Sequence, residues 1–351
     1  MSETAAILAQ MVDRLFTDHV DAALLAAAAQ GRWPSELWRL AEEQGLTTVL
    51  VPEARGGMGA SFHEVCVIAS VCGRHRVPVP LPETMAAGWL LAGAGLDVPA
   101  GPLSLGGANR DDDLRLQRAG TQWRLSGSAH RVPWGRMAGS LVLAVEQADA
   151  LLIVRAPREG CTVDHGSNVA GECRDTLRFT DHPVEVGPWP AGAAGNPVMM
   201  IGALMRSGQM AGALADILER SVSYANDRKQ FGRAIGKQQV IQQYLAVLAA
   251  EAAAVDVAAE AAFIAADAGN AEFLVAAAKT RAGTAVAPAV GIVHQVHGAI
   301  GFTLEHPLHW STRRLMSWRS EFGSDRHWAV VLGRRILDLG ADGFWPYLTA
   351  V

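Results

Sequence analysis

The stretch "DRKQFGRAIGKQQVIQQYLA", from Asp227 to Ala246, stops a helix-forming chain and then lets it resume. Its Phe231-Gly232 pair breaks the helical pattern, because glycine adopts turn conformations at little steric cost. A long apolar stripe interspersed with glutamines follows. The stretch therefore predicts two helices joined by a short turn, with the side chains of Arg228 and Gln230 at that turn.

Helical patterns lie on both sides of this turn. Before it, Met210, Leu214 and Ile217 fall on one helical face. After it, a second stripe is formed by Ile241, Tyr244, Leu245, Leu248, Ala252 and Val255. "NAEFLVAAAKTRAGTAVAPAVGIVHQVHG" predicts a third helix, and residues 325–339 predict a fourth. Helices of this length predict an antiparallel bundle over residues 196–351.

The rest of the chain divides into two blocks. Residues 1–98 show apolar residues at helical spacing, as in "AAILAQMVDRLFTDHV", and predict an N-terminal helical domain. Residues 99–195 hold short β-forming segments such as "TQWRLSGSAHRV" and "GSLVLAVEQ", and predict a middle β domain. The predicted fold is mainly α with a β middle domain. A doubly wound dinucleotide fold is disfavoured, since βαβ alternation and a G-x-G-x-x-G after a strand are missing.

Composition limits the classes of function. The chain has 351 residues and a net charge of -5, which does not indicate nucleic-acid binding. Its four cysteines form no Cys-x-x-Cys pair, as expected of reduced thiols in a cytoplasmic protein. The N-terminus lacks the pattern of a secretory signal, and no apolar stretch free of charge is long enough to predict a membrane span.

Four motifs, spread over nearly the whole chain, resemble the acyl-CoA dehydrogenase family. "YANDRKQFGRAIGKQQ" is similar to the family's Tyr-Ala-x-x-Arg-x-Gln-Phe-Gly-x-x-Ile signature, and "HQVHGAIGFTLEHPLHWSTRR" to its Gln-x-x-Gly-Gly-x-Gly-Phe-Thr segment. "VPEARGGMG" resembles its N-terminal Pro-Glu-x-x-Gly-Gly-x-Gly loop, and "WRLSGSAHRV" its Trp-x-Leu-x-Gly strand. Each motif is weak alone, but four in the family's order are specific.

The resemblance implies a fold and a chemistry. It implies a helical N-terminal domain, a β-barrel-like middle domain and a C-terminal four-helix bundle at the oligomer interface. It implies FAD-dependent α,β-dehydrogenation of an acyl-CoA thioester to the 2-enoyl-CoA, in a dimer or tetramer. Electron-transfer flavoprotein is the implied electron acceptor, and fatty acid or steroid side-chain degradation the implied process.

The resemblance also implies roles for residues near the opening turn. Arg228 would bind the FAD pyrophosphate of a neighbouring subunit, and a guanidinium with paired donors suits such a group. Gln230 and Phe231 would shape the same turn. The other implied cofactor-binding residues are Gln295, Gly298, Ala299 and Ser324. From the helix alone, an ion pair of Arg228 with Asp227 or Glu219 stays open.

Two histidine pairs, His294-x-x-His297 and His306-x-x-His309, raise the alternative of a zinc site. Histidines three residues apart can share a helix face. A second pair in a turn is a poor substitute for a closed ligand set with cysteine or carboxylate. No metal is therefore predicted.

The reaction needs a carboxylate that removes the α-proton. The family places this acid before the glycine of a turn that precedes the last helix, or early in the first bundle helix. Here these positions hold Phe322 and Gly202. Glu321 lies one residue before the first position and is the candidate catalytic residue, although one residue rotates a helical side chain by about 100°. The alternative for Glu321 is an ion pair with Arg319, Arg313 or Arg314.

Two functions follow from this pattern. The first is an active FAD-dependent acyl-CoA dehydrogenase. The second is a catalytically silent structural subunit that completes the FAD site of a partner dehydrogenase chain. Pro133 stands where the family has a hydroxyl side chain against the flavin ring, so this subunit's own ring contacts are in doubt. By analogy with short family members, the acyl group would be bulky or cyclic.

Overall fold

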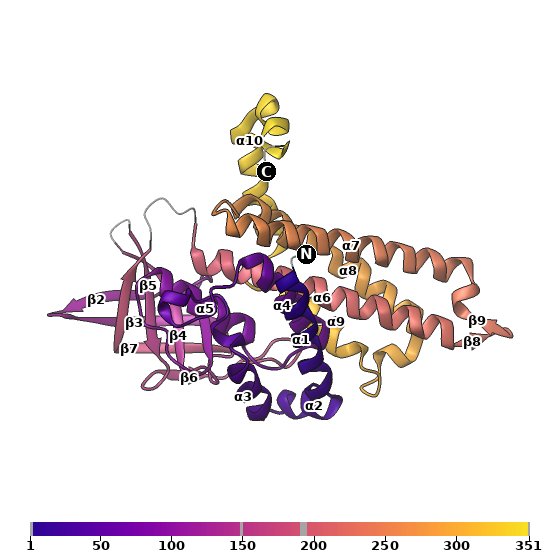
Figure 1. The fold of residues 1–351 in the computed structure, drawn as a ribbon, viewed down its shortest axis with the longest axis horizontal. Helices are drawn as coiled ribbons and strands as arrows, with labels where there is room; N and C mark the ends of the chain where they lie inside the picture. Colours follow the sequence, from indigo (N-terminus) through magenta and orange to yellow (C-terminus); the bar gives the residue numbers. More distant parts are fainter. Residues whose placement is uncertain (1–2, 148–149, 190–194, 350–351) are drawn as a thin grey trace. The chain divides into compact units, whose positions relative to one another are not determined.

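The structure is a computed structural model that describes residues 3–147, 150–189 and 195–349. Its elements follow the predicted order of helices, strands and helices (Figure 1). The chain forms two compact units: residues 1–17, 62–77 and 206–351, and residues 18–61 and 78–205. The predicted fold class is confirmed, while the domain ranges 1–98, 99–195 and 196–351 stay a prediction.

The unit of residues 18–61 and 78–205 is built on a sheet. Its strands are β1 (Leu103–Gly106), β2 (Arg115–Ala119), β3 (Gln122–Pro133), β4 (Ser140–Gln147), β5 (Ala150–Pro157), β6 (Thr162–Asp164) and β7 (Arg174–Pro188). Their order is β1-β4-β5-β7-β3-β2, with β6 paired to β7. Only the β1–β4 pair among these described strands is parallel. The inward faces share a core that includes Leu125, Leu141, Val154 and Phe179.

Helices complete this unit. They are α2 (Ala22–Ala29), α3 (Ser35–Glu43) and α5 (Leu81–Gly93), with the short turns η1 (Leu46–Thr48) and η2 (Glu53–Arg55). Helix α5 is buried along almost its whole length and packs against β1. The Thr84 hydroxyl accepts a hydrogen bond from the Leu103 N–H at 3.1 Å and lies 3.2 Å from the Leu103 carbonyl. This contact fastens the helix to the first strand.

The other unit is a helical bundle. Its long elements are α6 (Pro197–Asp227, from Arg206 onward), α7 (Gln239–Asp267), α8 (Glu272–His297), α9 (Leu308–Trp318) and α10 (Asp325–Thr349). Figure 1 shows α6, α7 and α8 running alongside one another. Met210, Leu214 and Ile217 are fully buried in one cluster with Leu248 and Val255. The predicted apolar stripes of α6 and α7 therefore face the core.

Two N-terminal segments join this bundle: α4 (Phe62–His75) and the part of α1 (Glu3–His19) up to residue 17. Glycines let α4 and α6 approach closely. A Cβ at Gly73 would lie 1.9 Å from the carbonyl oxygen of Gln209, and one at Gly212 would lie 1.8 Å from that of Ser70. No side chain fits at either position, so the crossing depends on both glycines.

Within residues 3–147, 150–189 and 195–349, one helical segment passes a test of length and mean hydropathy for a membrane span. This segment, residues 272–302, includes α8; its most apolar window of 18 residues has a mean hydropathy of 1.3, and 39% of that window is buried. The core helix of a bundle passes the same test. Because α8 contributes Val286 and Val293 to the bundle core, this single match is weak evidence of a span.

Candidate functional site

A two-stranded hairpin joins α6 to α7, where the sequence predicts a turn. β8 (Lys229–Gln230) pairs with β9 (Arg233–Ala234), and η3 (Ile235–Lys237) leads into α7. Phe231 (φ 51°) and Gly232 (φ 79°) form the tip in the left-handed region. The side chain of Phe231 is 94% exposed. The hairpin lies at one end of the bundle (Figure 1).

A groove with a cavity volume of ≈ 620 Å³ lies beside the hairpin. Its walls come from the end of α6, the hairpin, the start of α7 and the loop after α8. Five predicted cofactor-binding residues line it together, namely Arg228, Gln230, Gln295, Gly298 and Ala299. Phe231 and Ser324 are not among its lining residues. The tertiary structure thus brings together two motifs that lie far apart in the sequence.

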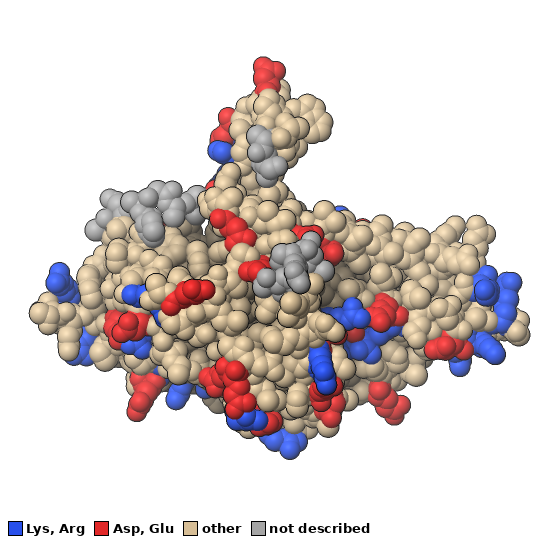
Figure 2. Space-filling model, viewed as in Figure 1, with Lys and Arg blue, Asp and Glu red and all other residues tan. Residues whose placement is uncertain are grey.

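Arg228 is exposed, and the described part of the chain offers its side chain no hydrogen-bond or ion-pair partner. Glu219 pairs with Arg74 instead, and the Asp227 carboxylate accepts from the Ser223 hydroxyl at 3.4 Å. The surface ion pair left open for Arg228 is therefore not formed. Figure 2 shows Lys and Arg side chains gathered over this hairpin. Such a surface attracts an anion.

The loop after α8 forms another wall of the groove. Gly298 (φ 65°, ψ −145°) ends α8 in a conformation that favours glycine, and a Cβ there would meet open space. The ring of His297 is buried and stacks on Tyr224 at a centroid distance of 4.5 Å. Its Nδ1 lies 2.7 Å from the Val293 carbonyl, so Nδ1 donates. Within the described residues, Nε2 is buried without a partner, and burial lowers the pKa of His297.

Glu321, the candidate catalytic residue, lies on the turn between α9 and α10. Its carboxylate accepts a hydrogen bond from Arg206 Nε at 2.8 Å, and the two side chains are 14% and 2% exposed. The Arg206 guanidinium also lies 5.7 Å from the ring of Trp318 and 5.5 Å from that of Phe322. Glu321 does form an ion pair, as the alternative foresaw, but with Arg206, which is not one of the three predicted partners, Arg319, Arg313 and Arg314. The role of Glu321 as base stays a prediction.

A buried lysine that sequence reasoning missed lies beneath the same turn. Lys279 Nζ donates to the carbonyl oxygens of Trp318 at 3.1 Å, Arg319 at 2.9 Å and Gly323 at 2.9 Å. Burial lowers the pKa of Lys279 to about 7, and the charge of Glu321 opposes that shift. The one signal available was a lysine within the apolar pattern "FLVAAAKTRAG".

Three other predicted positions lie outside the groove. The Ser324 hydroxyl accepts from the His327 N–H at 3.2 Å and so caps the start of α10. Gly202 is a buried residue of α6, and Pro133 ends β3. The cofactor-binding role of Ser324 remains a prediction. So does the expectation that Pro133 cannot supply the family's hydroxyl contact with the flavin ring.

The histidine pairs do not form a closed ligand set. His309 Nδ1 bonds the His306 carbonyl at 2.8 Å, as His297 does with Val293. Over residues 3–147, 150–189 and 195–349, the one group of three candidate ligands is Asp111, Asp112 and His130. Asp111 of that group already holds Arg131 with two hydrogen bonds. These contacts give no support to a metal site.

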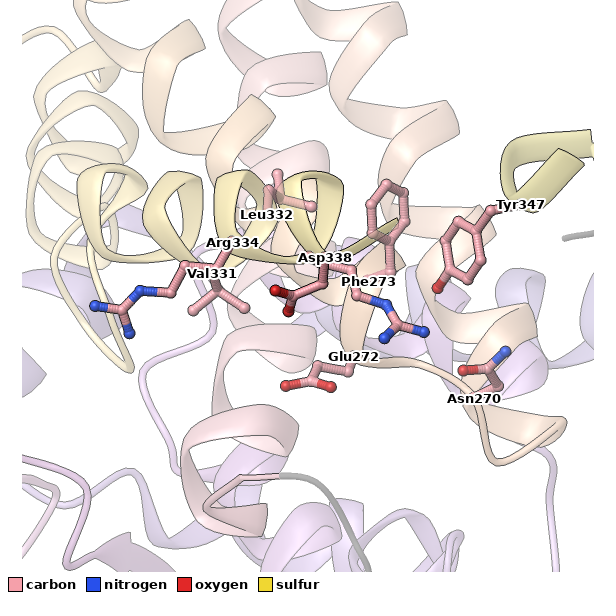
Figure 3. Close-up of a pocket in the computed structure, with 9 residues that line it drawn as sticks. Asn270, Glu272, Phe273, Val331, Leu332, Arg334, Asp338 and Tyr347 are labelled. Carbon is pink, nitrogen blue, oxygen red and sulfur yellow. The ribbon is translucent and has the colours of Figure 1, made fainter. Parts of the chain in front are cut away.

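A second hollow lies between the start of α8 and α10 (Figure 3), with a cavity volume of ≈ 410 Å³. The rings of Phe273 and Tyr347 pack edge to face on its wall, 5.1 Å apart. Its charged residues carry both signs, as Glu272, Arg334 and Asp338 show. This mixture gives it no preference for an anion such as a pyrophosphate.

Comparison with protein families identifies both ends of the chain. Residues 2–97 match the acyl-CoA dehydrogenase N-terminal domain, and residues 194–337 match the acyl-CoA dehydrogenase C-terminal domain. The chain belongs to the acyl-CoA dehydrogenase family. The resemblance found in its four motifs is thus confirmed.

Curated acyl-CoA dehydrogenases are among the proteins similar to this chain. The chain is 28% identical to the acyl-CoA dehydrogenase FadE34 of Mycobacterium tuberculosis over 81% of its own length, but it spans only 40% of that protein. It is 29% identical to the acyl-CoA dehydrogenase IpdE2 of the same organism over 88% of its length and 89% of the relative. The match to IpdE2 of Mycolicibacterium smegmatis is 25% over 88% of this chain and 91% of that one.

Solved structures share the fold. A Tcur3481-Tcur3483 steroid acyl-CoA dehydrogenase variant superposes with a TM-score of 0.88 at 24% identity, over 97% of this chain and 99% of that one. Butyryl-CoA dehydrogenase from Megasphaera elsdenii gives 0.86 at 16% identity, over 96% and 99%. These identities establish the fold alone.

FAD is the cofactor of this family of flavoproteins, and the groove beside Arg228 has features that suit it. The unpaired guanidinium of Arg228 suits a pyrophosphate. Gly298 leaves room for close backbone approach, and the unpaired Nε2 of buried His297 marks an acceptor that the fold leaves unsatisfied.

Proposed function

We propose that this chain binds the adenosine diphosphate half of FAD in the Arg228 groove. We propose further that it takes part in α,β-dehydrogenation of an acyl-CoA thioester to the 2-enoyl-CoA, within a dimer or tetramer. The observation that carries the proposal is the exposed, unpaired guanidinium of Arg228 in a groove lined by Gln295, Gly298 and Ala299. These residues come from the two family motifs at which the chain was expected to bind cofactor.

The groove residues have distinct roles in this proposal. Arg228 supplies a guanidinium with paired donors for the pyrophosphate. Gln295 contributes an amide, and Gly298 and Ala299 admit the nucleotide close to the backbone. Bound FAD supplies the acceptor for the hydride that leaves Cβ. Phe231 and Gln230, on the exposed hairpin, suit a contact with a neighbouring subunit whose cofactor they help to hold.

A second candidate function is favoured by the turn of Glu321. Its carboxylate is held by the buried guanidinium of Arg206, and Phe322 and Gly202 offer no acid at the family's two positions. An arginine-bound carboxylate is a poor proton acceptor, because the cation stabilises its charged form. In this alternative the chain is a silent structural subunit, and a partner dehydrogenase chain supplies the base.

The substrate and partners are also proposals. We propose a bulky or cyclic acyl group, and electron-transfer flavoprotein as the electron acceptor. One solved relative is described as a steroid acyl-CoA dehydrogenase, and another as a complex of ChsE4 with ChsE5 from Mycobacterium tuberculosis, with a TM-score of 0.85 at 20% identity. A cytoplasmic location and the absence of nucleic-acid binding complete the proposal.

Arg228→Ala tests the groove. Loss of a charge-assisted contact to phosphate costs about 1.5–3 kcal/mol, or roughly ten- to hundredfold in FAD affinity. The measurement is flavin retained after dilution and gel filtration of the purified chain, alone and with any partner subunit. Arg233→Ala is the matched control, since Arg233 is exposed on the same hairpin but does not line the groove. Equal retention by both variants would remove Arg228 from the cofactor site.

Glu321→Gln separates the two candidate functions. The measurement is anaerobic bleaching of bound flavin by acyl-CoA, with and without a partner chain. A base contributes about 10²- to 10⁴-fold in rate. If Glu321 is the base, bleaching stops while FAD stays bound. If the chain is a silent subunit, the Glu321→Gln chain assembles with the partner, and acyl-CoA bleaches the bound flavin of that assembly at the wild-type rate.

A further inference from the structure

The turn between α9 and α10 has a strained backbone. Phe322 (φ 51°) and Gly323 (φ 86°) are consecutive residues in the left-handed region. Glycine adopts this conformation readily, whereas a bulky side chain such as phenylalanine does so only where its surroundings impose it. A Cβ at Gly323 would lie 2.5 Å from Trp328 Nε1. The turn is therefore packed tightly against Trp328, and the left-handed conformation of Phe322 needs a contact that stabilises it.

Lys279 is the group best placed to do this. It is fully buried, and its ammonium donates to two carbonyls before the bend, Trp318 and Arg319, and to one after it, Gly323. An ammonium has three donors and no acceptor, so these three bonds use it completely. One charged group thus ties together the two arms of the turn.

Charge, rather than side-chain volume, makes this contact specific. The carbonyls of Trp318 and Arg319 lie at the C-terminal end of α9, where the helix dipole favours a cation. A methionine at position 279 would fill a similar space and leave all three carbonyls without this donor. A buried carbonyl without a hydrogen-bond partner is costly. Loss of the Lys279 donor should therefore destabilise the turn conformation in which these carbonyls are buried.

The held turn fixes two further contacts. Glu321, inside the turn, reaches Arg206. The carbonyl of Phe322 accepts a hydrogen bond from the buried indole of Trp328, with Nε1 at 2.9 Å. Both contacts depend on the backbone conformation of Phe322. A change at Lys279 should therefore be felt at Trp328, although the structure gives no direct bond between these two side chains.

We propose that Lys279 is the positioning residue of this turn, and that it holds Phe322 in the left-handed conformation that keeps Glu321 on Arg206. The resemblance places the family's acid in this turn, so Lys279 maintains the shape of that position in a chain that carries no acid at 322. The contacts lie within one compact unit and in a different place from the FAD groove. The proposal therefore stands or falls independently of the proposed function.

Lys279→Met tests the proposal through the indole N–H of Trp328. The measurement is its hydrogen exchange at pH 6, by NMR of protein with 15N-labelled tryptophan, with the signal assigned by Trp328→Phe. We expect exchange to accelerate about tenfold, the change that loss of one ordinary hydrogen bond produces. The control is Val286→Ala, a cavity in the buried part of the same helix. It should lower the melting temperature yet leave the Trp328 exchange rate within about twofold.

Phe322→Gly provides a second, independent measure. Glycine adopts the left-handed conformation without help. Lys279→Met should therefore lower the melting temperature less in the Phe322→Gly background than in the wild type, and Phe322→Gly should restore folding if Lys279→Met alone does not fold. Three results would each overturn the proposal. The first is that the decreases in melting temperature of Lys279→Met and Phe322→Gly are strictly additive, and the second is that Phe322→Gly does not restore folding. The third is that Lys279→Met and Val286→Ala accelerate the Trp328 exchange equally.

Discussion

The groove of Arg228 and the turn of Glu321 belong to the same compact unit, and an arginine is central to each, yet their surroundings are opposite. Arg228 is exposed and unpaired within the described chain. Arg206 is 2% exposed at its side chain and binds Glu321. A solvated guanidinium in a groove can bind a ligand, whereas a guanidinium in a buried ion pair is already bonded within the protein. The difference teaches that the same residue type is free to bind a ligand, as we propose for Arg228, in one place and is part of the buried core in the other.

The largest expected effect comes from breaking the buried pair. Arg206→Met removes the guanidinium from a carboxylate that is itself mostly buried, a change that costs about 3–5 kcal/mol in the free energy of unfolding. Arg228→Met should change that free energy by less than about 0.5 kcal/mol, as expected for an exposed side chain. Denaturant unfolding of the FAD-free proteins measures both. Similar losses at the two arginines would erase the distinction between groove and turn.

A smaller effect is expected from the histidines beside the groove. Burial lowers the pKa of His294 and His297 below the ordinary value of 6.5. As pH falls below about 6.5, these histidines bind more protons in the unfolded chain than in the folded chain, so the free energy of unfolding decreases. Denaturant unfolding at pH 7.5 and 5.5 should show this loss, and His297→Phe should reduce it.

The control for this pH dependence is His165→Gln, since His165 is exposed and lies in the other unit. Its variant should lose as much stability on acidification as the wild type. A pH dependence that is unchanged in His297→Phe would show that this ring titrates in the folded protein as it does in the unfolded one.

The smallest effect on stability is expected at the tip of the hairpin. Phe231 is 94% exposed, so Phe231→Ser should change the free energy of unfolding of the isolated chain by no more than about 0.5 kcal/mol. If the hairpin contacts a neighbouring subunit, the same change should weaken association, measured by sedimentation at several concentrations. Lys229→Ser, also exposed in the hairpin, is the control. A large loss of stability in the monomer would mean that Phe231 serves the fold instead.

Local sequence patterns predicted much of this protein's organisation. The Phe231-Gly232 break predicted the turn between α6 and α7, because a turn with glycine is decided by neighbouring residues; its form as a two-stranded hairpin was not predicted. The apolar stripes predicted which faces of α6 and α7 are buried, because burial follows the helical period. The family resemblance predicted that the motifs around Arg228 and Gln295 contact the same kind of cofactor, and in the structure both segments line one groove.

Contacts between distant segments could not be obtained in this way. The one-residue offset of Glu321 left its orientation undecided, and only the tertiary structure paired it with Arg206, 115 residues away. The sequence around Lys279 did not predict its contacts with the carbonyl oxygens of Trp318, Arg319 and Gly323, which lie 39 to 44 residues away. The packing of α4 against α6 likewise depends on Gly73 facing the Gln209 carbonyl and on Gly212 facing the Ser70 carbonyl across the two helices.

The sequence by itself determined the order of helical and β-forming blocks, the turn at Phe231-Gly232 and the family, because each depends on residues close together in the chain or on a motif. The tertiary structure alone decided which charges are paired, which are exposed, and how the turn after α9 is held. The physical reason is that the energy of a charge depends on its burial and on its partners in space. Neither is a property of the neighbouring sequence.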